Sequence, residues 1–240
     1  MVFGLVTAAG LGTRSGLDGR MRKELLPLYD AVEGKLVLRP VLDMVIRRLE
    51  NAGCQKVVVV VDPSDRMTIS YLETNFPACD LVFQETKLGY GNAVYLGSRK
   101  CSGHDVLLNA GDGIVAMETY YRELVVSGES TLTLFEVDNP SSYGNAVLSQ
   151  DGKRVISVSE KPAIPISNLA IAATYYFKKN LLNYISAESK ELTESIQKMV
   201  SKESVIPKII PKDTWLSIGK KENYHKILTR SYEMVKKLVI

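Results

Sequence analysis

The stretch that decides the fold lies at the start of the chain and reads VFGLVTAAGLGTRSGLDGRMRKELLP, residues 2–27. Its first residues, 2–6, are apolar enough to form a buried strand. A turn follows with glycines at positions 10, 12 and 16, which permit positive φ angles and let a ligand approach the backbone closely. Successive backbone N–H groups in such a turn form a concave site for anions. We therefore expect a strand that ends in a phosphate-binding loop.

Two cations follow these glycines. Arg14 offers a planar guanidinium and Lys23 a compact ammonium, both suited to phosphate oxygens. This combination favours a triphosphate ligand, although glycine-rich turns of similar spacing also occur in α/β proteins that bind nothing there. Two familiar nucleotide motifs are excluded, because residues 10–16 do not match G-x-G-x-x-G and no GK[ST] follows them.

The next segments alternate between helix and strand patterns. Apolar residues at helical spacing predict a helix that begins near Pro40 and ends at Gly53, and KVVVVV at 56–61 predicts a fully buried strand. A second helix is expected from 62 to about 75, followed by a strand at 80–84. This βαβαβ order implies a parallel sheet with right-handed crossovers, whose ligands bind at the carboxyl ends of the strands.

Candidate binding residues follow the strand at 80–84 and the next predicted strand along the chain. Gln84 presents an amide that can pair with the edge of a base, while Gly89 and Gly91 permit close approach of the backbone. The apolar residues before 111–113 predict a strand that ends in Gly-Asp-Gly, which leaves the Asp112 carboxylate sterically open, as a magnesium ligand must be. Both segments also fit ordinary loops, with Asp112 as a turn residue.

The second half of the chain is rich in strands. Turn residues, including a hairpin signal at 151–152, separate predicted strands at 131–137, 145–149, 154–160 and 168–177. Helical spacing returns at 190–200, a strand is expected within 202–210, and a helix begins near 222. We expect this half to flank the first and to supply an acceptor pocket.

Taken together, AAGLGTR and KELLP resemble the sugar-1-phosphate nucleotidylyltransferases, and KELLPLYD is most similar to the UTP–glucose-1-phosphate uridylyltransferase branch. Later segments resemble the same family in the same order: Q-x4-G-x-G-x-A from Gln84, GD at 111–112, P-x-x-YG at 140–144 and EKP at 160–162. The resemblance implies an α/β fold, a doubly wound, Rossmann-like mixed sheet with a β-rich sugar-binding portion. It would form one domain over 1–240, with a nucleotide-binding half at 1–130 and a sugar-binding half at 131–240.

The resemblance also implies roles for single residues. The catalytic residues would be Arg14, Lys23, Asp112 and Lys161, and Asp112 would also hold the Mg²⁺ cofactor. The nucleotide would contact Ala8, Ala9, Gly10, Gly12, Thr13, Gln84 and Gly89, and the sugar would contact Gly144, Glu160 and Tyr175. Chemically these roles are sound, because a carboxylate accepts hydrogen bonds from sugar hydroxyls and an ammonium neutralises phosphate. Without its neighbours, EKP also fits a surface charge pair before a turn.

The chain departs from the family pattern at two positions. Ser217 stands in the W-x-D-x-G segment where the family has the aspartate that completes its metal site, and a hydroxyl is a weaker Mg²⁺ ligand than a carboxylate. Ala173 stands where a glycine usually borders the sugar, so one methyl group would narrow the pocket. For Ser217 two outcomes stay open: the ion is held by Asp112, the phosphates and water molecules, or activity is reduced.

Composition excludes several other classes of function. With 240 residues, a net charge of +3 and no dense basic block, the chain is not expected to bind nucleic acid or membranes as a main partner. The N-terminus lacks the pattern of a signal peptide, which predicts a cytoplasmic protein.

The apolar face of the last helix, after Glu222, suits either the core or contact with another subunit of a homo-oligomer.

The sequence thus predicts transfer of a nucleotidyl group from an NTP, expected to be UTP, to a sugar 1-phosphate, expected to be glucose 1-phosphate. The products would be an NDP-sugar and pyrophosphate. Two alternatives stay open: a thymidylyltransferase that uses dTTP, and a regulator that binds sugar nucleotides without catalysis, for which Ser217 is the motive.

Overall fold

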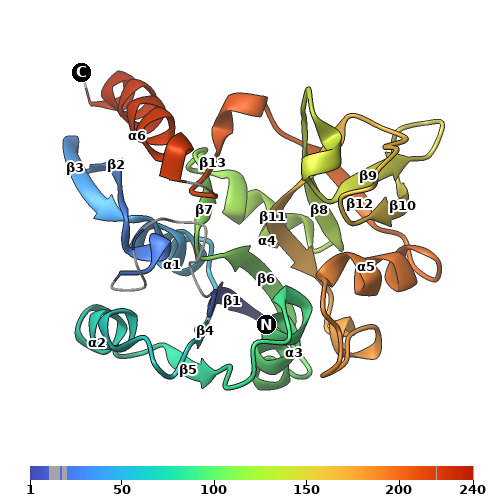
Figure 1. Ribbon diagram of the computed structural model, residues 1–240, viewed down its shortest axis with the longest axis horizontal. Coiled ribbons are helices and arrows are strands. Elements are labelled where there is room, and N and C mark those ends of the chain that lie inside the picture. The colour runs from blue at the N-terminus through green and yellow to red at the C-terminus, as the bar shows by residue number, and fades with distance from the viewer. Residues whose placement is uncertain (11–16, 18–20, 220, 240) are drawn as a thin grey trace.

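A nine-stranded mixed sheet forms the centre of the protein (Figure 1). The computed structural model describes residues 1–10, 17, 21–219 and 221–239. The main path of the sheet runs β10-β9-β11-β6-β1-β4-β5, and β8 lies beside β11 with β12 at its outer edge. Its strands are β1 (Val2–Ala8), β4 (Lys56–Val61), β5 (Asp80–Phe83), β6 (Asp105–Ala110), β8 (Thr131–Glu136), β9 (Asn145–Leu148), β10 (Val155–Ser159), β11 (Leu169–Phe177) and β12 (Ile206–Ile209).

The sheet changes character between the two halves of the chain. The first-half strands β6, β1, β4 and β5 are parallel, whereas β11 joins β6 in the antiparallel sense and carries the second-half strands with it. The prediction of a doubly wound α/β fold with a mixed sheet is therefore confirmed. Both halves share one sheet, and the assignment of 1–240 to a single domain stays a prediction.

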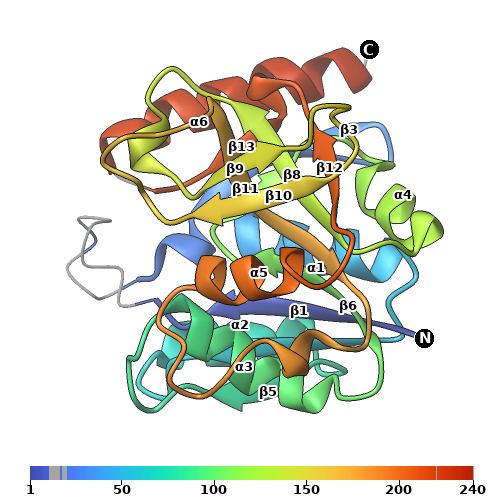
Figure 2. The same cartoon turned by 90° about the vertical axis from the view of Figure 1, so that its right-hand side faces the viewer.

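Helices cover both faces of this sheet. On one face lie α1 (Val41–Asn51), α2 (Arg66–Asn75) and α4 (Tyr120–Ser127), and on the other lie α3 (Tyr90–Lys100) and α5 (Leu192–Val200). In Figure 2, α5 and α3 lie on the side that faces the viewer, and α6 (Lys221–Val235) lies along the top of the molecule. No helix in the described ranges combines the length and apolar character needed to cross a lipid bilayer.

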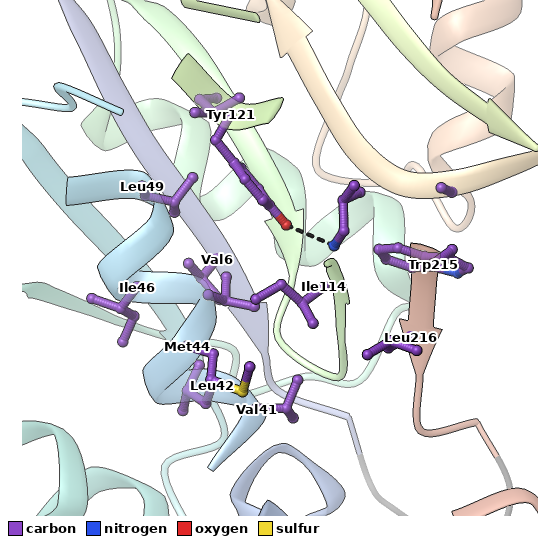
Figure 3. Close-up of a cluster of buried hydrophobic side chains, with 14 of the residues drawn as sticks. Val6, Val41, Leu42, Met44, Ile46, Leu49, Ile114, Tyr121, Trp215 and Leu216 are labelled. Atoms are coloured by element: carbon purple, nitrogen blue, oxygen red, sulfur yellow. Dashed lines mark hydrogen bonds between the residues drawn. The ribbon is translucent and has the colours of Figure 1, made fainter. Parts of the chain in front are cut away.

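Alternating side chains of the buried strands fill the two cores. In β4, Val57, Val59 and Val61 pack toward α1, while Val58 and Val60 pack toward α3. Both sets are almost fully buried, which explains why the strand reads as an uninterrupted apolar run. Figure 3 shows the α1 side of the core, where Ile46 and Leu49 lie near Val6.

A hairpin of β2 (Pro27–Val32) and β3 (Lys35–Pro40) follows the first loop and was not predicted. Its turn places Glu33 at φ 50° and Gly34 at φ 72°, the left-handed pair of a tight hairpin. The terminal helix α6 packs against this hairpin, where the Tyr224 hydroxyl donates to the Pro27 carbonyl at 2.7 Å. Part of the predicted apolar face of α6 thus packs against the core. Contact of this helix with another subunit of a homo-oligomer stays a prediction.

Two elements begin four residues later than predicted. The second helix begins at Arg66 instead of 62, because the Asp65 side chain caps it by accepting from the Thr68 N–H at 3.1 Å. The strand expected within 202–210 is limited to Ile206–Ile209, where it pairs with β8.

Gly97 lets α3 pack closely on the sheet. A Cβ there would collide with Leu5 and would lie 2.8 Å from Val60 Cγ2. We expect Gly97→Val to lower the free energy of unfolding by about 1–3 kcal/mol, because overpacking outweighs the gain in helix propensity. Urea denaturation measures this, with Gly219→Val, where a Cβ meets open space, as the control. Equal stability of the two variants would contradict this packing.

Candidate active site

The carboxyl ends of the parallel strands meet at one edge of the sheet and surround a cavity of about 300 Å³. Six residues predicted from the sequence or the resemblance line it: Ala9, Gly10, Lys23, Gln84, Gly89 and Asp112. The remaining lining residues are Thr7, Glu24, Lys87, Tyr90, Ala93 and Ala110. The chain therefore brings together residues from positions 7 to 112.

Lys23 and Asp112 form an ion pair inside this cavity. Lys23 begins the short helix η1 (Lys23–Leu25), and Asp112 lies in the loop between β6 and β7 (Gly113–Val115). Their side chains keep 16% and 20% of their surface exposed, so both remain within reach of a ligand. The cavity thus presents a cation and a carboxylate to a ligand at the carboxyl edge of the sheet.

Glu24 is a cavity residue that the sequence analysis did not single out. It is 3% exposed, and its Oε2 atom has no hydrogen-bond partner among the described residues. Burial, and to a smaller extent the Asp112 carboxylate, raise the pKa of Glu24 against the opposing effect of Lys23, and the result is a pKa of about 7. The site thus contains a carboxyl group that exchanges its proton near neutral pH.

A second cluster of buried charges fixes the start of η1. The Arg22 guanidinium lies 3.2 Å from Asp62 and 3.6 Å from Asp65, and Lys87 reaches Asp62 at 3.0 Å. Because Arg22 and both carboxylates are buried, removal of one partner would leave a costly uncompensated charge. These contacts connect η1 to the ends of β4 and β5, and so hold Lys23 in place.

Asn109 supports the loop that carries Asp112. It is fully buried in β6, and its Nδ2 donates at 2.7 Å to the carbonyls of Ala110 and Gly113. Its Oδ1 accepts from Tyr121 at 3.0 Å and from Thr174 at 2.5 Å. The sequence signal was a lone polar residue in an apolar strand, which gives no indication of its partners.

The predicted base-contacting residues, Gln84 and Gly89, line the same cavity. Gln84 follows β5 and is buried, with its backbone N–H bonded to the Val61 carbonyl at 2.9 Å. Gly89 has φ 122°, and a Cβ there would collide with the Lys190 carbonyl, so only glycine fits. The loop backbone is therefore free to approach a ligand.

Two of the three predicted sugar residues, Gly144 and Glu160, lie together at the second-half strands. The Thr193 hydroxyl donates to Glu160 at 3.3 Å, and a Cβ on Gly144 would lie 3.4 Å from the same carboxylate. Tyr175 is buried, which raises its pKa, and the Glu160 charge raises it further. The structure brings Gly144 and Glu160 together and adds Thr193, which sequence reasoning missed.

Lys161 follows Glu160 in a left-handed backbone conformation, with φ 37°. Its Nζ pairs with Glu160 Oε1 at 2.7 Å, and its side chain is 52% exposed. The described lining of the nucleotide-side cavity includes neither Lys161 nor the three predicted sugar contacts. Ala8 ends β1 in the core, and the predictions for Gly12, Thr13 and Arg14 lie outside the described residues.

Ser217, where the resemblance implies an aspartate, lies beside the loop that carries Asp112. In β13 (Trp215–Ser217) it pairs with Gly113, and the next N–H, of Ile218, donates to the Asp112 carbonyl at 2.8 Å. The described residues contain no group of three or more His, Cys, Asp or Glu side chains that could hold a metal. The oxygen donors present, with the unpartnered Glu24 Oε2 beside Asp112, fit Mg²⁺ only if phosphate and water fill most of its positions.

A comparison with protein families matches residues 3–233 to the nucleotidyl transferase model. The match covers both halves of the shared sheet and every described site residue above. The chain belongs to the nucleotidyl transferase family.

Curated members of this family are similar over most of the chain. A protein named as a mannose-1-phosphate guanyltransferase in Sulfolobus acidocaldarius is 30% identical over 95% of this chain, which spans 62% of that protein. A glucose-1-phosphate thymidylyltransferase of Mycolicibacterium smegmatis is 25% identical over 90% of this chain and 77% of its own length. The bifunctional protein GlmU of Methanococcus maripaludis is 29% identical, and this chain spans 46% of it.

Solved structures support the nucleotidyl transferase fold. The chain superimposes on a protein described as a glucose-1-phosphate thymidylyltransferase from Bacillus anthracis with a TM-score of 0.79 at 19% identity, covering 98% of this chain and 96% of that one. Apo UDP-glucose pyrophosphorylase gives a TM-score of 0.76 at 18% identity, covering 99% and 100%. At these identities the likeness concerns the fold.

The pKa of Glu24 leads to a prediction about stability. A carboxyl whose pKa rises from 4.5 to about 7 on folding stabilises the protein below pH 4.5 and loses that contribution as the pH rises through 7. We expect the stability of the wild type relative to Glu24→Gln to fall by about 3 kcal/mol between pH 4.5 and 8. Urea unfolding at several pH values measures this, with exposed Glu118→Gln as the control. A difference that is constant with pH would contradict the assignment.

Proposed function

We propose that this protein transfers a nucleotidyl group from UTP to glucose 1-phosphate, giving UDP-glucose and pyrophosphate. The observation that carries the proposal is the convergence of Lys23, Asp112, Gln84 and Gly89 on one cavity at the carboxyl edge of the sheet. Family membership supports the reaction class, because relatives named as guanyl- and thymidylyltransferases act on sugar 1-phosphates. The KELLPLYD segment supports the choice of UTP.

The reaction requires alignment and charge neutralisation more than proton transfer. A phosphate oxygen of the sugar phosphate attacks the α-phosphorus, and the bond from that phosphorus to pyrophosphate breaks. The attacking oxygen is already anionic near neutral pH, so no general base is needed. This agrees with the described lining of the cavity, which contains two lysines, two carboxyl groups and the Gln84 amide but no histidine or cysteine.

Each residue has a distinct task in this proposal. Lys23 neutralises charge on the α-phosphate, and Gln84 and Gly89 hold the base. Asp112 would hold a magnesium ion, which supplies further positive charge to the phosphates when bound. Lys161 and Arg14 would position the attacking phosphate and the outgoing pyrophosphate.

The nucleotide and the sugar are the finer part of the proposal. UTP and dTTP differ at the base by one methyl group, which a pocket discriminates by only about 1–3 kcal/mol. A screen for pyrophosphate release tests both choices, with five nucleoside triphosphates against the 1-phosphates of glucose, galactose, mannose and N-acetylglucosamine. Fastest release with UTP and glucose 1-phosphate is expected, and faster release with another pair would replace them.

A second candidate function is a regulator that binds a sugar nucleotide without turnover. It is favoured by the absence of a carboxylate at Ser217, beside Asp112. The same screen separates the two functions when nucleotide binding is measured alongside. Binding without pyrophosphate release across the whole panel would favour the regulator.

Lys23 provides the sharpest test of catalysis by charge. Lys23→Ala is expected to lower turnover by roughly 10² to 10³, by analogy with other preorganised contacts that stabilise transition-state charge. Lys198→Ala, at an exposed position of α5, is the matched control and should turn over as the wild type does. Wild-type turnover by a folded Lys23→Ala variant would contradict the role of Lys23.

The Ser217 position predicts a gain of metal affinity. Ser217→Asp would place a second carboxylate next to Asp112, and we expect it to tighten Mn²⁺ binding about tenfold, because affinity rises with the charge of the ligands. Electron paramagnetic resonance of Mn²⁺ without nucleotide measures this, with exposed Ser102→Asp as the control. Equal affinity of wild type and Ser217→Asp would show that no ion binds at this position.

A further inference from the structure

The side-chain amide of Gln84 has only one orientation open to it. Its Nε2 donates to the Gly89 carbonyl at 3.0 Å and to Asn92 Oδ1 at 2.9 Å. An amide nitrogen carries two hydrogens, so these contacts use both of them. Rotation of the amide by 180° would bring Oε1 against the same two oxygens, with two hydrogen bonds lost.

Asn92, in the first turn of α3, is fixed in turn by the second half of the chain. Its Nδ2 donates to the carbonyl of Ala187 at 2.6 Å, and the side chain is buried. A carbonyl oxygen can only accept, so Nδ2 must face Ala187 and Oδ1 must face Gln84. The Ala187 carbonyl therefore fixes the orientation of the Asn92 amide, and the Asn92 oxygen in turn fixes the orientation of the Gln84 amide.

The segment that supplies this carbonyl is itself held against α3. The Gly91 N–H donates to the Lys190 carbonyl at 2.9 Å. A Cβ at Gly91 would lie 2.8 Å from the Ser189 carbonyl, so the two backbones are in close contact. The Ala187 carbonyl is thus held in place as the acceptor for the Asn92 amide.

The consequence is that Gln84 presents an acceptor to the ligand. Its Oε1 receives no hydrogen bond from the described residues, and Gln84 lines the cavity. An acceptor pairs with a ring N–H, which uracil and thymine carry at N3 and guanine at N1. Cytosine has a lone pair at N3, which would face the Gln84 oxygen without a hydrogen between them.

We propose that Asn92 is a positioning residue that holds Gln84 as an acceptor and thereby makes the site select bases with a ring N–H over cytosine. The inference rests on the proposed function for its choice of a nucleotide ligand. To that function the inference adds a role for Asn92, which touches no ligand, and a rule that the base of the donor nucleotide must carry a ring N–H. The rule depends on the direction of two hydrogen bonds, in addition to the shape of the pocket.

The test is isothermal titration calorimetry of UTP and CTP binding in magnesium buffer without sugar phosphate. The wild type should bind UTP more tightly than CTP. In Asn92→Leu the Gln84 amide loses one of its two partners, and the ratio of the two affinities should fall roughly tenfold, the scale of one hydrogen bond. Equal affinities in the wild type, or an unchanged ratio in Asn92→Leu, would overturn the proposal.

Two further variants separate orientation from folding. Asn92→Asp keeps an oxygen that accepts from Gln84, so its ratio should stay nearer the wild type than that of Asn92→Leu; equal ratios in the two variants would count against the proposal. Asn75→Leu removes an exposed asparagine that also donates to a backbone carbonyl, and should leave the ratio unchanged. If Asn92 had a purely structural role, Asn92→Leu would lower the affinities for UTP and CTP by the same factor.

The wild type alone supplies an independent measurement. UTP methylated at N3 has no ring N–H, and it should bind more weakly than UTP by a factor similar to that for CTP. Tight binding of this analogue would contradict the acceptor role of Gln84. Because these experiments measure binding, loss of the proposed function would appear separately, as selective UTP binding without pyrophosphate release.

Discussion

The parallel pairing of β1 with β4 on one side and β6 on the other is the constraint on which the rest of the structure depends. Register places Ala8 opposite Val61 and Thr7 opposite Ala110, so the three strands end at the same level. The segments that lead to Lys23, Gln84 and Asp112 begin at this level, since Phe83 at the end of β5 lies opposite Val61. Because both faces of the strands are buried, a slip in register would expose apolar side chains as well as scatter the site.

Buried charge is the second constraint. Arg22 is satisfied by Asp62 and Asp65, and Lys23 by Asp112, so the cavity keeps its cations without leaving them uncompensated. Glu24 is the exception, and burial raises its pKa to about 7. A site that already holds one carboxylate next to a lysine keeps the second carboxyl partly protonated near neutral pH.

Much of the fold was readable from local pattern, because KVVVVV and its neighbours carry signals that need no tertiary context. The hairpin at Glu33 and Gly34 was missed because its turn lacks the usual Asn-Gly or Asp-Gly pair. In the site, Gln84 and Asp112 could be found because they follow strand ends. Asn92, Asn109 and Asp62 could not, because a buried polar residue acquires its role from partners distant in the chain, such as Ala187 and Tyr121.

In the proposed function, one edge of the sheet binds the base through Gln84 and Gly89 and the phosphates through Lys23. The most direct measurement is a crystal structure of the protein with UTP and no sugar phosphate. We expect the uracil to contact the Gln84 oxygen and the α-phosphate to lie within hydrogen-bond distance of the Lys23 ammonium. A triphosphate bound away from this edge, or a base that does not contact Gln84, would contradict it.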